Sequence, residues 1–503
     1  MAEQNQNTPI QQTNELAVRR EKLAALREAG CDPFLVTKYD VTHESCDVLA
    51  GFDALERNEE AGKEGTPVSL AGRMISRRVM GKASFVHLLD GKGKIQLYVK
   101  RDDVGEEVYA AFKKWDVGDI VGVCGYPFRT KTGEISIHAT SLSLLSKSLL
   151  PLPEKFHGLT NTDMRYRQRY VDLIANPEVK DTFLKRSAIL RGIRAFLDAK
   201  GFVEVDTPIL TPFEIGANAR PFVTHHNTLD MDMFLRIETE LYLKRLIVGG
   251  MNRVYEVGRI FRNEGMDTKH NPEFTSVELY QAFTDYHGMM DIVEELYATL
   301  ARDICGSTVI PYGEHMIDLG HFERMTMVEA VKKYAGTDYY AWADDEEARR
   351  VAGELHVEVA PTATKGLVLA ELFDAFVEDK LIQPTIIYEY PVDNSPLAKR
   401  KPDEPDFTER FEYFICGTEY GNAFSELNDP IDQRGRFEKQ VAEKLAAEPE
   451  SGAQVDEDFL CALEYGMPPT GGLGFGVDRL VMLLTNSPSI RDVLLFPTMK
   501  PEA

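Results

Sequence analysis

Arginine, glutamate and aromatic residues alternate through the segment 253–282 of the chain. Side chains two residues apart in a strand share a face, so Ile260, Arg262 and Glu264 are expected on one surface. After the loop 265–272, a partner strand is expected to place four side chains on a single face: Phe274, Ser276, Glu278 and Tyr280. Charged groups on a sheet face are costly unless they line a ligand cleft. The pattern predicts a cleft for a charged ligand; a surface hairpin with ion pairs is the alternative.

A second pair of carboxylates, Glu412 and Glu419, flanks the turn-like residues 416–418. A hairpin there would bring both acids to one cation, which suits Mg²⁺ held between carboxylates and substrate phosphates. Strict alternation places Glu419 on the face opposite Asn422, Phe424 and Glu426, so a common site needs a bulge near Gly421. The alternative is two exposed acids in an acidic chain.

Glycines crowd the segment 471–479, which reads Gly-Gly-Leu-Gly-Phe-Gly-Val-Asp-Arg. Glycine allows the backbone to approach a ligand closely. Arg479 falls where a helix is expected to begin, and a helix N-terminus attracts phosphate. The segment has neither the GxGxxG context nor the Lys-Ser/Thr of a P-loop. A tight turn packed on the sheet is the alternative.

The elements that must position these residues fall into two groups. Residues 1–14 are expected to be disordered, and 15–29 to form a surface helix that ends at Gly30. Residues 66–146 alternate short β-rich runs with glycine turns and carry a helix-like piece, 106–115, after the third run. Five strands with a helix after the third is the plan of an OB-fold, a barrel that commonly binds oligonucleotides.

The remaining chain reads as an α+β domain. A helix is expected after Asn176-Pro177, followed by a strand that ends at Pro208. Strands dominate 254–282, helical spacing returns over 286–380, and strands resume at 385–390 and 409–428. We predict four parts: 1–65, a disordered tail and helical extension; 66–150, the OB-fold; 151–182, a linker; and 183–503, a catalytic domain with a helical insertion around 325–382.

Composition narrows the class of protein. The 503 residues contain six scattered cysteines and no CxxC pair, so neither a zinc site nor a disulfide framework is indicated. The polar N-terminus and the lack of long apolar stretches predict a cytoplasmic protein without a membrane segment. The net charge of -24 opposes nucleic-acid binding overall, but a local basic patch can act against the total. Such a patch is expected on the barrel: Arg73, Arg77, Arg78, Lys82, Lys92, Lys94, Lys100 and Arg101.

From about residue 15 onward the sequence resembles the class II aminoacyl-tRNA synthetases. Three ordered motifs carry the resemblance: the helix and strand ending at Pro208, Phe261-Arg-Asn-Glu264 with its partner strand, and Gly474-Phe-Gly-Val-Asp-Arg479. Within that class, the stretches 262–265, 270–275, 278–280 and 421–430 look like bacterial-type lysyl-tRNA synthetases with an N-terminal OB-fold. The resemblance implies an antiparallel-sheet catalytic domain behind an OB-fold barrel.

The resemblance also implies roles for individual residues. Arg262 would bind the α-phosphate and the lysine carboxylate, and Arg479 would pair with the γ-phosphate. Phe274 would stack on adenine, and Glu264, His270 and Asn271 would also contact ATP. Glu412 and Glu419 would hold Mg²⁺, with more than one ion per subunit. The first motif would form a homodimer interface.

The amino-acid specificity can be argued from charge. A lysine pocket must neutralise an ε-ammonium, because a desolvated, unpaired charge costs several kcal/mol. Acids come from three segments, with oxygen acceptors beside them, and the expected lysine-binding set is Gly216, Glu240, Glu278, Tyr280, Asn422, Phe424 and Glu426. The stretch 216–222 resembles the family's amino-acid-binding loop but departs from it at Ile215 and Asn218.

The implied reaction joins lysine to tRNA(Lys) through a lysyl-adenylate formed from ATP, with no DNA partner. The barrel would read the anticodon, with Phe85 stacking on a base and Arg73, Gln96 and Glu134 contacting base edges. A barrel-core position for Phe85 is the alternative. Two rival functions are a ligase that attaches lysine to a protein, which would lack the barrel, and a regulator built on an inactive synthetase domain.

Overall fold

The structure is a computed structural model that describes residues 9–153, 159–212, 219–447 and 453–502. The chain divides into two compact units, Met1–Thr160 and Asn161–Ala503. Among the described residues, every helix is too short or too polar to cross a membrane.

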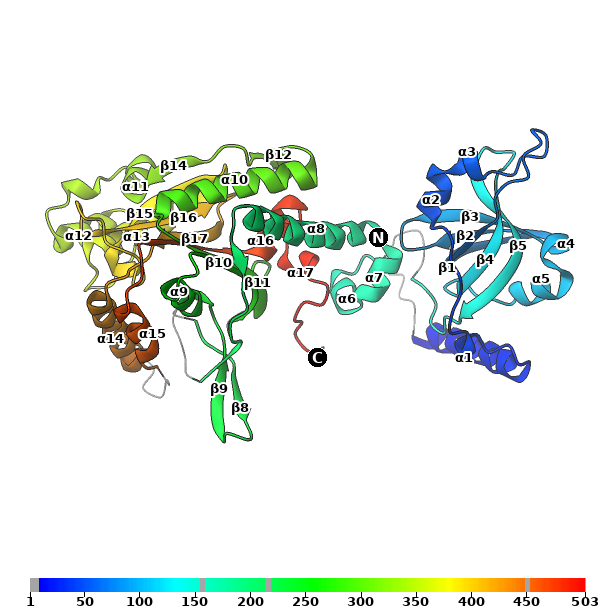
Figure 1. Cartoon of the computed structure of the whole chain (residues 1–503), viewed down its shortest axis with the longest axis horizontal. Helices are drawn as coiled ribbons and strands as arrows, with labels where there is room; N and C mark the ends of the chain where they lie inside the picture. The colour runs from blue at the N-terminus through cyan, green and yellow to red at the C-terminus, as the bar shows by residue number, and fades with distance from the viewer. Residues whose placement is uncertain (1–8, 154–158, 213–218, 448–452, 503) are drawn as a thin grey trace. The chain divides into compact units, whose positions relative to one another are not determined.

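The first unit is a closed five-stranded barrel with strand order β1-β2-β3-β5-β4 (Figure 1). Its strands are β1 (Val68–Met80), β2 (Ala83–Leu89), β3 (Lys94–Lys100), β4 (Ile120–Arg129) and β5 (Ile135–Ser146). Two short helices, α4 (Arg101–Val104) and α5 (Glu106–Phe112), follow the third strand. The predicted OB-fold is therefore confirmed. Alternating burial along β2 sends Val86 and Leu88 into the barrel core.

Helix α1 (Pro9–Glu28) precedes the barrel, together with η1 (Pro33–Leu35), α2 (Ser45–Ala50) and α3 (Phe52–Leu55). The expectation of disorder over 1–14 is wrong for residues 9–14, which form the first turns of α1. A proline is well tolerated at the start of a helix, because its missing N–H would have no partner there. Residues 1–8 lie outside the described part of the chain. Gly30 has a φ of +69°, as the predicted helix stop requires.

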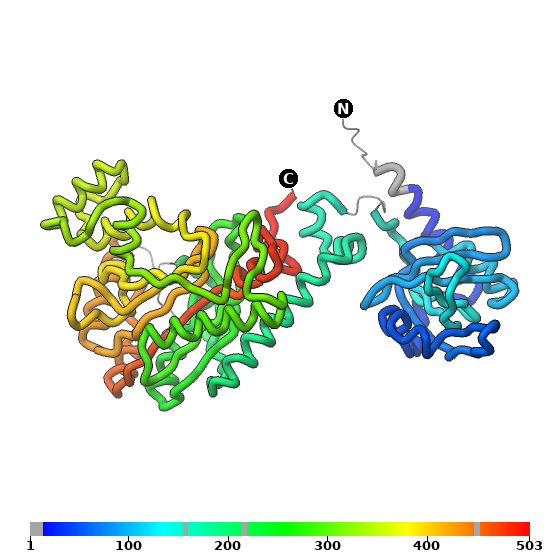
Figure 2. Tube along the Cα trace, turned by 90° about the horizontal axis from the view of Figure 1, so that it is seen from above, coloured from blue at the N-terminus to red at the C-terminus, as the bar shows by residue number. Residues whose placement is uncertain are grey.

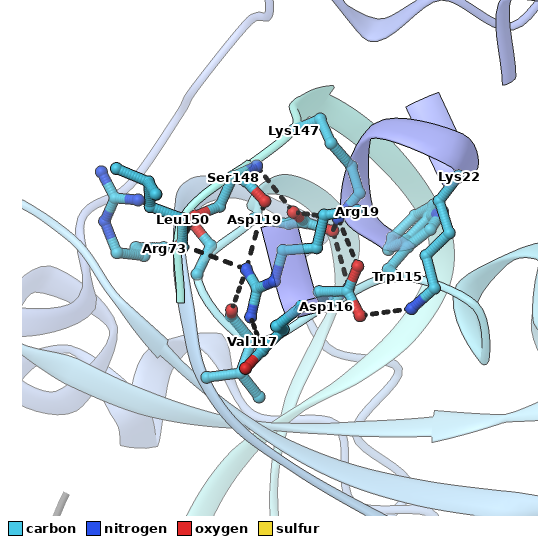
Figure 3. Close-up of polar contacts among 12 residues, drawn as sticks. Arg19, Lys22, Arg73, Trp115, Asp116, Val117, Asp119, Lys147, Ser148 and Leu150 are labelled. Carbon is cyan, nitrogen blue, oxygen red and sulfur yellow. Dashed lines mark hydrogen bonds and ion pairs between the residues drawn. The ribbon is translucent and has the colours of Figure 1, made fainter. Parts of the chain in front are cut away.

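A polar network fastens α1 to one end of the barrel (Figure 3). Arg19 is buried, and its Nη1 donates to the carbonyl oxygens of Val117 at 3.1 Å, Ser148 at 3.1 Å and Leu150 at 3.3 Å. Arg19 therefore satisfies three backbone acceptors where the chain enters β4 and leaves β5.

Two lysines extend this network through a pair of aspartates (Figure 3). Asp116 accepts from Lys22 of α1 at 2.5 Å and from Lys147 at 2.6 Å. Lys147 is buried and also donates to the buried Asp119 at 2.8 Å. Lys22 is partly exposed, so α1 is held in this unit chiefly by the buried Arg19, whose removal would leave backbone carbonyl oxygens without their donor.

The second unit is built on an eight-stranded sheet of order β14-β15-β16-β17-β18-β11-β10-β6. The strands are β6 (Val203–Glu204), β10 (Arg253–Phe261), β11 (Glu273–Ala282), β14 (Glu323–Thr326), β15 (Thr385–Pro391), β16 (Phe407–Phe414), β17 (Glu419–Ser425) and β18 (Thr470–Gly476). Neighbours pair antiparallel except at the two edges, where β14 runs parallel to β15 and β6 parallel to β10. The predicted antiparallel-sheet architecture is confirmed.

The two faces of this sheet have different chemistry. Helices α8 (Glu178–Ala199), α10 (Tyr286–Cys305) and α16 (Val477–Leu484) pack with Val277 and Leu279 in one hydrophobic core. Figures 1 and 2 show α8 and α10 side by side. Because alternate strand residues point to opposite faces, Glu278 and Tyr280 lie on the face away from this core.

The segment 286–380 is less uniformly helical than its spacing predicts. After α10 it contains the hairpin β12 (Val309–Tyr312) and β13 (His315–Asp318), and then β14, the edge strand of the main sheet. Ile310 and Ile317 pair across the hairpin, and both are buried in the hydrophobic core that contains Val277 and Leu279. Burial of this facing pair favours two short strands there. Helices α11 (Met327–Ala335), α12 (Asp345–Glu354) and α13 (Lys365–Phe376) then form a second apolar cluster with one face of β15 and β16.

Residues 162–175, which the sequence assigns to a linker, form α6 (Thr162–Arg167) and α7 (Arg169–Ala175) of the second unit. The buried Arg169 ties α7 to the C-terminal segment through the carbonyl oxygens of Arg491 and Leu495. A charged side chain buried by distant backbone gives no local periodic signal. The other elements are β7 (Leu210–Thr211), β8 (Val223–His226), β9 (Met231–Leu235), α9 (Glu240–Val248), α14 (Pro430–Ala447), α15 (Glu457–Glu464), α17 (Ile490–Val493), η2 (Tyr339–Ala341), η3 (Glu378–Lys380) and η4 (Val392–Asn394).

Candidate active site

The open face of the sheet in the second unit forms a cavity of about 630 Å³. Strand β11 supplies four of its lining residues at every second position: Phe274, Ser276, Glu278 and Tyr280. The predicted pairing with β10 is present, with Ile260 opposite Phe274. The cavity also collects most other residues singled out in the sequence: Glu240, Arg262, Glu264, His270, Asn271, Glu412, Glu419, Asn422, Phe424, Glu426 and Arg479.

Arg262 follows the end of β10 and stands over the ring of Phe274, with its guanidinium carbon 5.5 Å from the ring centroid. Its Nε is buried and makes no hydrogen bond to the described residues. A buried, unpartnered donor on a cation is unfavourable until an acceptor binds. The position suits an anionic group of a ligand beside a flat ring that stacks on Phe274.

Arg479, at the start of α16, shares the loop end of the cavity with His270. The Arg479 guanidinium donates to His270 Nε2 at 3.2 Å, so the ring proton is on Nδ1. Nδ1 lies 2.8 Å from Asp267 Oδ2. Hydrogen bonds from His270 and from the backbone lower the pKa of Asp267 to about 2. This chain of contacts orients a cation at the cavity rim.

Asn271 lines the cavity, but its amide is engaged by the backbone. Its Nδ2 donates to the carbonyl oxygen of Glu273 at 2.7 Å, and its Oδ1 accepts from the N–H of Thr498 at 3.3 Å. These bonds fix the loop between the two hairpin strands.

Glu412 on β16 and Glu419 on β17 lie on the same cavity wall. Phe414 pairs with Glu419 and Tyr413 with Gly421, so Tyr420 is an extra residue in the ladder. This is the bulge predicted near Gly421, and it puts Glu419 on the same wall as Asn422. Burial and then repulsion from Glu412 raise the pKa of Glu419 to about 7. Two neighbouring carboxylates that repel each other in a buried site are a suitable donor set for Mg²⁺.

Arg410 is a lining residue that the sequence reading missed. Its Nη2 donates to Glu412 Oε1 at 2.6 Å, and its Nε donates to Asn422 Oδ1 at 3.1 Å. The guanidinium also lies over the Tyr390 ring at 4.8 Å, and the Tyr390 hydroxyl donates to Glu412 Oε2 at 3.0 Å. The available signal was strand alternation, since Arg410 stands two residues before Glu412.

Three acids meet at the other end of the cavity: Glu240 of α9, Glu278 of β11, and Glu426 just after β17. Burial and then the charge of Glu240 raise the pKa of Glu278 to about 7. Glu278 accepts from the Tyr280 hydroxyl at 3.3 Å and from the N–H of Thr239 at 3.3 Å. Burial also raises the pKa of Glu426. Crowded, buried acids of this kind favour a cationic ligand.

Glycine is required where β18 passes these acids. A Cβ on Gly472 would lie 2.0 Å from Glu426 Oε1 and 2.6 Å from Cε1 of Tyr280. Gly472 therefore makes room for the pocket, whereas a Cβ on Gly471 would meet Thr284, Asp285 and Met289 instead. Gly216, the remaining predicted lysine contact, lies outside the described residues, as do Ile215 and Asn218.

On the barrel, Phe85 lies on the outer face of β2 rather than in the core. Its ring centroid is 5.2 Å from that of Tyr98, which also packs against Phe128 and His138. Beside this aromatic surface, Gln96 Nε2 donates to Glu134 Oε2 at 2.8 Å.

Arg73 does not join that surface. It pairs with Leu89 at the far end of the β1–β2 ladder, and its Nη1 donates to the carbonyl oxygen of Gly118 at 2.7 Å. Arg77, another member of the predicted basic patch, is bound to the carbonyl oxygens of Phe112 and Trp115. Both arginines therefore donate hydrogen bonds to backbone carbonyl oxygens of the barrel unit in this structure.

Comparison with known families agrees with this arrangement. Residues 161–500 match the family described as tRNA synthetases class II (D, K and N), and residues 68–145 match the OB-fold nucleic acid binding domain. A lysine–tRNA ligase of Moorella thermoacetica is 57% identical over 488 residues, covering 97% of this chain and 98% of that protein. The chain belongs to the lysine–tRNA ligase family.

Other members of the lysine–tRNA ligase family are similar over the same extent. The enzyme of Enterococcus faecalis is 54% identical over 501 residues, which cover 99% of this chain and 100% of that protein. The enzyme of Bacillus subtilis is 52% identical over 488 residues, covering 97% of each chain. Both units of a lysine–tRNA ligase are therefore represented, and the cavity lies in the class II portion.

Proposed function

We propose that the chain activates L-lysine with ATP in the cavity of the second unit and transfers it to tRNA(Lys). The observation that supports this proposal is that basic and acidic side chains gather at different ends of one cavity. Arg262 and Arg479 lie toward one end, where a polyphosphate is to be held, and Glu240, Glu278 and Glu426 crowd the other, where an alkylammonium is to be held. The buried Nε of Arg262 and the Oε1 of Glu426 have no hydrogen-bond partner among the described residues.

In the first step, the lysine carboxylate attacks the α-phosphorus of ATP in line, giving lysyl-adenylate and pyrophosphate. Arg262 would orient the carboxylate and the α-phosphate, and Arg479 would neutralise the γ-phosphate. Phe274 would stack on adenine, with Glu264, His270 and Asn271 around it. Reactions of this type depend on positioning and charge stabilisation rather than on a protein nucleophile.

Mg²⁺ is the cofactor that the acids at Glu412 and Glu419 fit. The pKa of Glu419 is raised because burial and the nearby charge of Glu412 both disfavour its ionised form. A divalent cation bound between the two carboxylates would offset both the burial and the repulsion. Bound there, Mg²⁺ would neutralise charge on the polyphosphate and the pyrophosphate leaving group. Arg410 and Tyr390 would hold Glu412 in place.

Lysine selection follows from the crowded acids. A substrate ammonium placed among Glu240, Glu278 and Glu426 would relieve their mutual repulsion, whereas an acidic side chain would add to it. Tyr280, Asn422 and Phe424 would complete the contacts, with Gly216 from the loop outside the described residues.

In the second step, the 3′-hydroxyl of the terminal tRNA ribose attacks the adenylate carbonyl, and AMP leaves. The barrel would bind the anticodon, with a base stacked on Phe85 beside Gln96 and Glu134. The aromatic surface formed with Tyr98 supports this assignment. Arg73 would need to leave Gly118 to contact a base.

We further propose a cytoplasmic homodimer that pairs through the first motif. Exposed apolar side chains on that motif, Leu184 and Val203, and Ile209 directly after it support an interface there. Light scattering on the purified chain tests the dimer, and a monomer at micromolar concentration would contradict it.

ATP–pyrophosphate exchange with each of the twenty amino acids tests the proposed reaction. We expect exchange with lysine to exceed exchange with every other amino acid. Charging of tRNA(Lys) then separates a tRNA ligase from a ligase that modifies protein. Absence of exchange with all amino acids would favour a regulator built on an inactive synthetase domain.

A further inference from the structure

Helix α9 carries a lysine, Lys244, whose side chain is fully buried against two acids of the cavity. Its Nζ lies 2.5 Å from Glu240 Oε1, one helical turn earlier, and it forms a second ion pair with Glu426 Oε2. Neither the sequence pattern nor the proposed contacts with lysine include this residue. Two of the three acids expected to receive the substrate's ammonium groups are thus already paired with an ammonium of the protein.

Two aromatic rings also pack near the Lys244 ammonium. Its Nζ lies 5.5 Å from the ring centroid of Phe424 and 6.0 Å from that of Phe459 on α15. Burial alone lowers the pKa of a lysine, but Glu240 and Glu426 outweigh burial and raise the pKa of Lys244 above its ordinary value. The ammonium therefore stays charged. Removing a charge from water costs several kcal/mol, so its two acids must hold it firmly.

The carboxylate of Glu426 stands between Lys244 and the cavity. Its Oε2 faces Lys244, and its Oε1 has no hydrogen-bond partner among the described residues. Oε1 lies against Gly472, where an added Cβ would meet it at 2.0 Å and would also meet the Tyr280 ring. Lys244 thus holds Glu426 from behind and leaves the other oxygen on the cavity side.

The charges around Glu426 come from several elements. Glu240 and Lys244 face it from α9, and Glu278 and Tyr280 face it from β11. Burial, Glu240 and Glu278 raise the pKa of Glu426, and Lys244 opposes them. Without Lys244, nothing among these groups would oppose burial and the two acids, so the pKa of Glu426 would rise further.

We propose that Lys244 is a positioning residue for amino-acid selection: by pairing with Glu240 and Glu426 it holds both carboxylates in the orientation in which the pocket accepts the substrate's ammonium groups. This inference rests on the proposed function as a lysine-activating enzyme. Lys244 does not touch the substrate; it acts through the two acids.

The test replaces Lys244 with methionine, which has a similar length and no charge. In ATP–pyrophosphate exchange, Lys244→Met is expected to raise the KM for lysine about tenfold or more, because a buried carboxylate loses its partner. The KM for ATP should stay within about twofold of wild type, since the polyphosphate end of the cavity is untouched. As pH rises, the variant's KM for lysine should fall more steeply than that of wild type, because the Glu426 carboxyl has lost the cation that favours its ionised form.

Arg245→Met is the matched control on the same helix. Arg245 pairs with Asp456 at 2.7 Å and Asp458 at 2.9 Å, away from the three acids. This control is expected to lower the melting temperature without a selective change in the KM for lysine. An unchanged KM for lysine in Lys244→Met, or an equal rise for lysine and ATP, would overturn the proposal.

A triple variant keeps the test decisive if Lys244→Met does not fold. Lys244→Met with Glu240→Gln and Glu426→Gln removes all three charges, and it is compared with the Glu240→Gln, Glu426→Gln double variant. Because Lys244 acts through these two acids, the triple variant should bind lysine within about twofold of the double variant. A large additional loss would contradict this mechanism. Wild-type protein without lysine-dependent exchange would instead refute the proposed function.

Discussion

The guanidinium of Arg410 donates to Glu412 Oε1 at 2.6 Å, so the proposed metal carboxylate is held by a cation of its own strand. The same guanidinium donates to Asn422, a proposed lysine contact, at 3.1 Å. One side chain therefore links the metal wall to the amino-acid wall of the cavity.

Arg410→Met should impair both walls. We expect pyrophosphate exchange to slow about a hundredfold and the Mg²⁺ concentration for half-maximal rate to rise, because Glu412 loses a partly buried partner. A Mg²⁺ titration of the exchange rate measures this change. Arg410→Lys keeps the charge but lacks the planar guanidinium that donates to two side chains at once, so it should recover only part of the rate. Wild-type Mg²⁺ dependence in Arg410→Met would show that Arg410 does not support the metal site.

Arg262→Ala should slow lysine-dependent exchange about a hundredfold or more, because loss of one positioned charge donor costs about that much in other enzymes. The buried Nε of Arg262 has no protein partner in the described chain, so the loss should appear in activity more than in stability. Thermal melting of the same preparation serves as the control. Near-normal exchange would remove Arg262 from its assigned role.

Gly472→Ala should weaken lysine binding selectively. The added Cβ would overlap Glu426 Oε1 and the Tyr280 ring, so both side chains must shift. We expect the KM for lysine to rise about tenfold and the KM for ATP to change little. Gly353→Ala is the control, since a Cβ there meets nothing within 4 Å. Equal effects on both substrates would indicate a general disturbance of the sheet.

Glu278→Gln should stabilise the protein without ligands at pH 8 while weakening lysine binding. The pKa of Glu278 is about 7 when folded, against an ordinary value of 4.5, so the folded state binds this proton more tightly. As pH rises from 4.5 to 7, the ionised carboxylate therefore costs the folded state roughly 3 kcal/mol.

Thermal melting of wild type and Glu278→Gln at pH 5 and pH 8 measures this effect. The variant's advantage should be small at pH 5 and larger at pH 8. Glu419 has a similarly raised pKa in both proteins, so only the difference between them reports on Glu278. A variant less stable than wild type at pH 8 would contradict the assignment.

Phe85→Ala should reduce tRNA charging without affecting adenylate formation. A stacked base contributes about 1–3 kcal/mol, so the KM for tRNA should rise roughly five- to 150-fold. Phe34→Ala is the control, because Phe34 is an exposed ring elsewhere in the same unit. Equal effects of both substitutions on charging would argue against stacking on Phe85.

Much of the cavity could be predicted from strand alternation. A period of two fixes which of Phe274, Val277 and Glu278 face the pocket and which face the core. The requirement that Glu419 and Asn422 share a wall also predicted the bulge, which the extra residue Tyr420 provides.

The internal partners of the pocket residues could not be predicted in the same way. Lys244 and Glu426 lie on distant segments, and their pairing depends on how α9 packs against the end of β17. Arg169 differs in part: its charge pairs with Asp172, three residues on, but its other partners are carbonyl oxygens near the C-terminus. Periodicity reports which face of an element is apolar, but not which remote charge neutralises a buried one.

The fastening of α1 to the barrel sets where an anticodon-binding fragment can be cut. A fragment begun at residue 66, where the strand pattern starts, would lose Arg19 and Lys22 and uncover the carbonyl oxygens of Val117 and Ser148. One that begins before Arg19 and ends after Leu150 keeps those bonds. The folding unit therefore begins before the first strand of the barrel and includes α1.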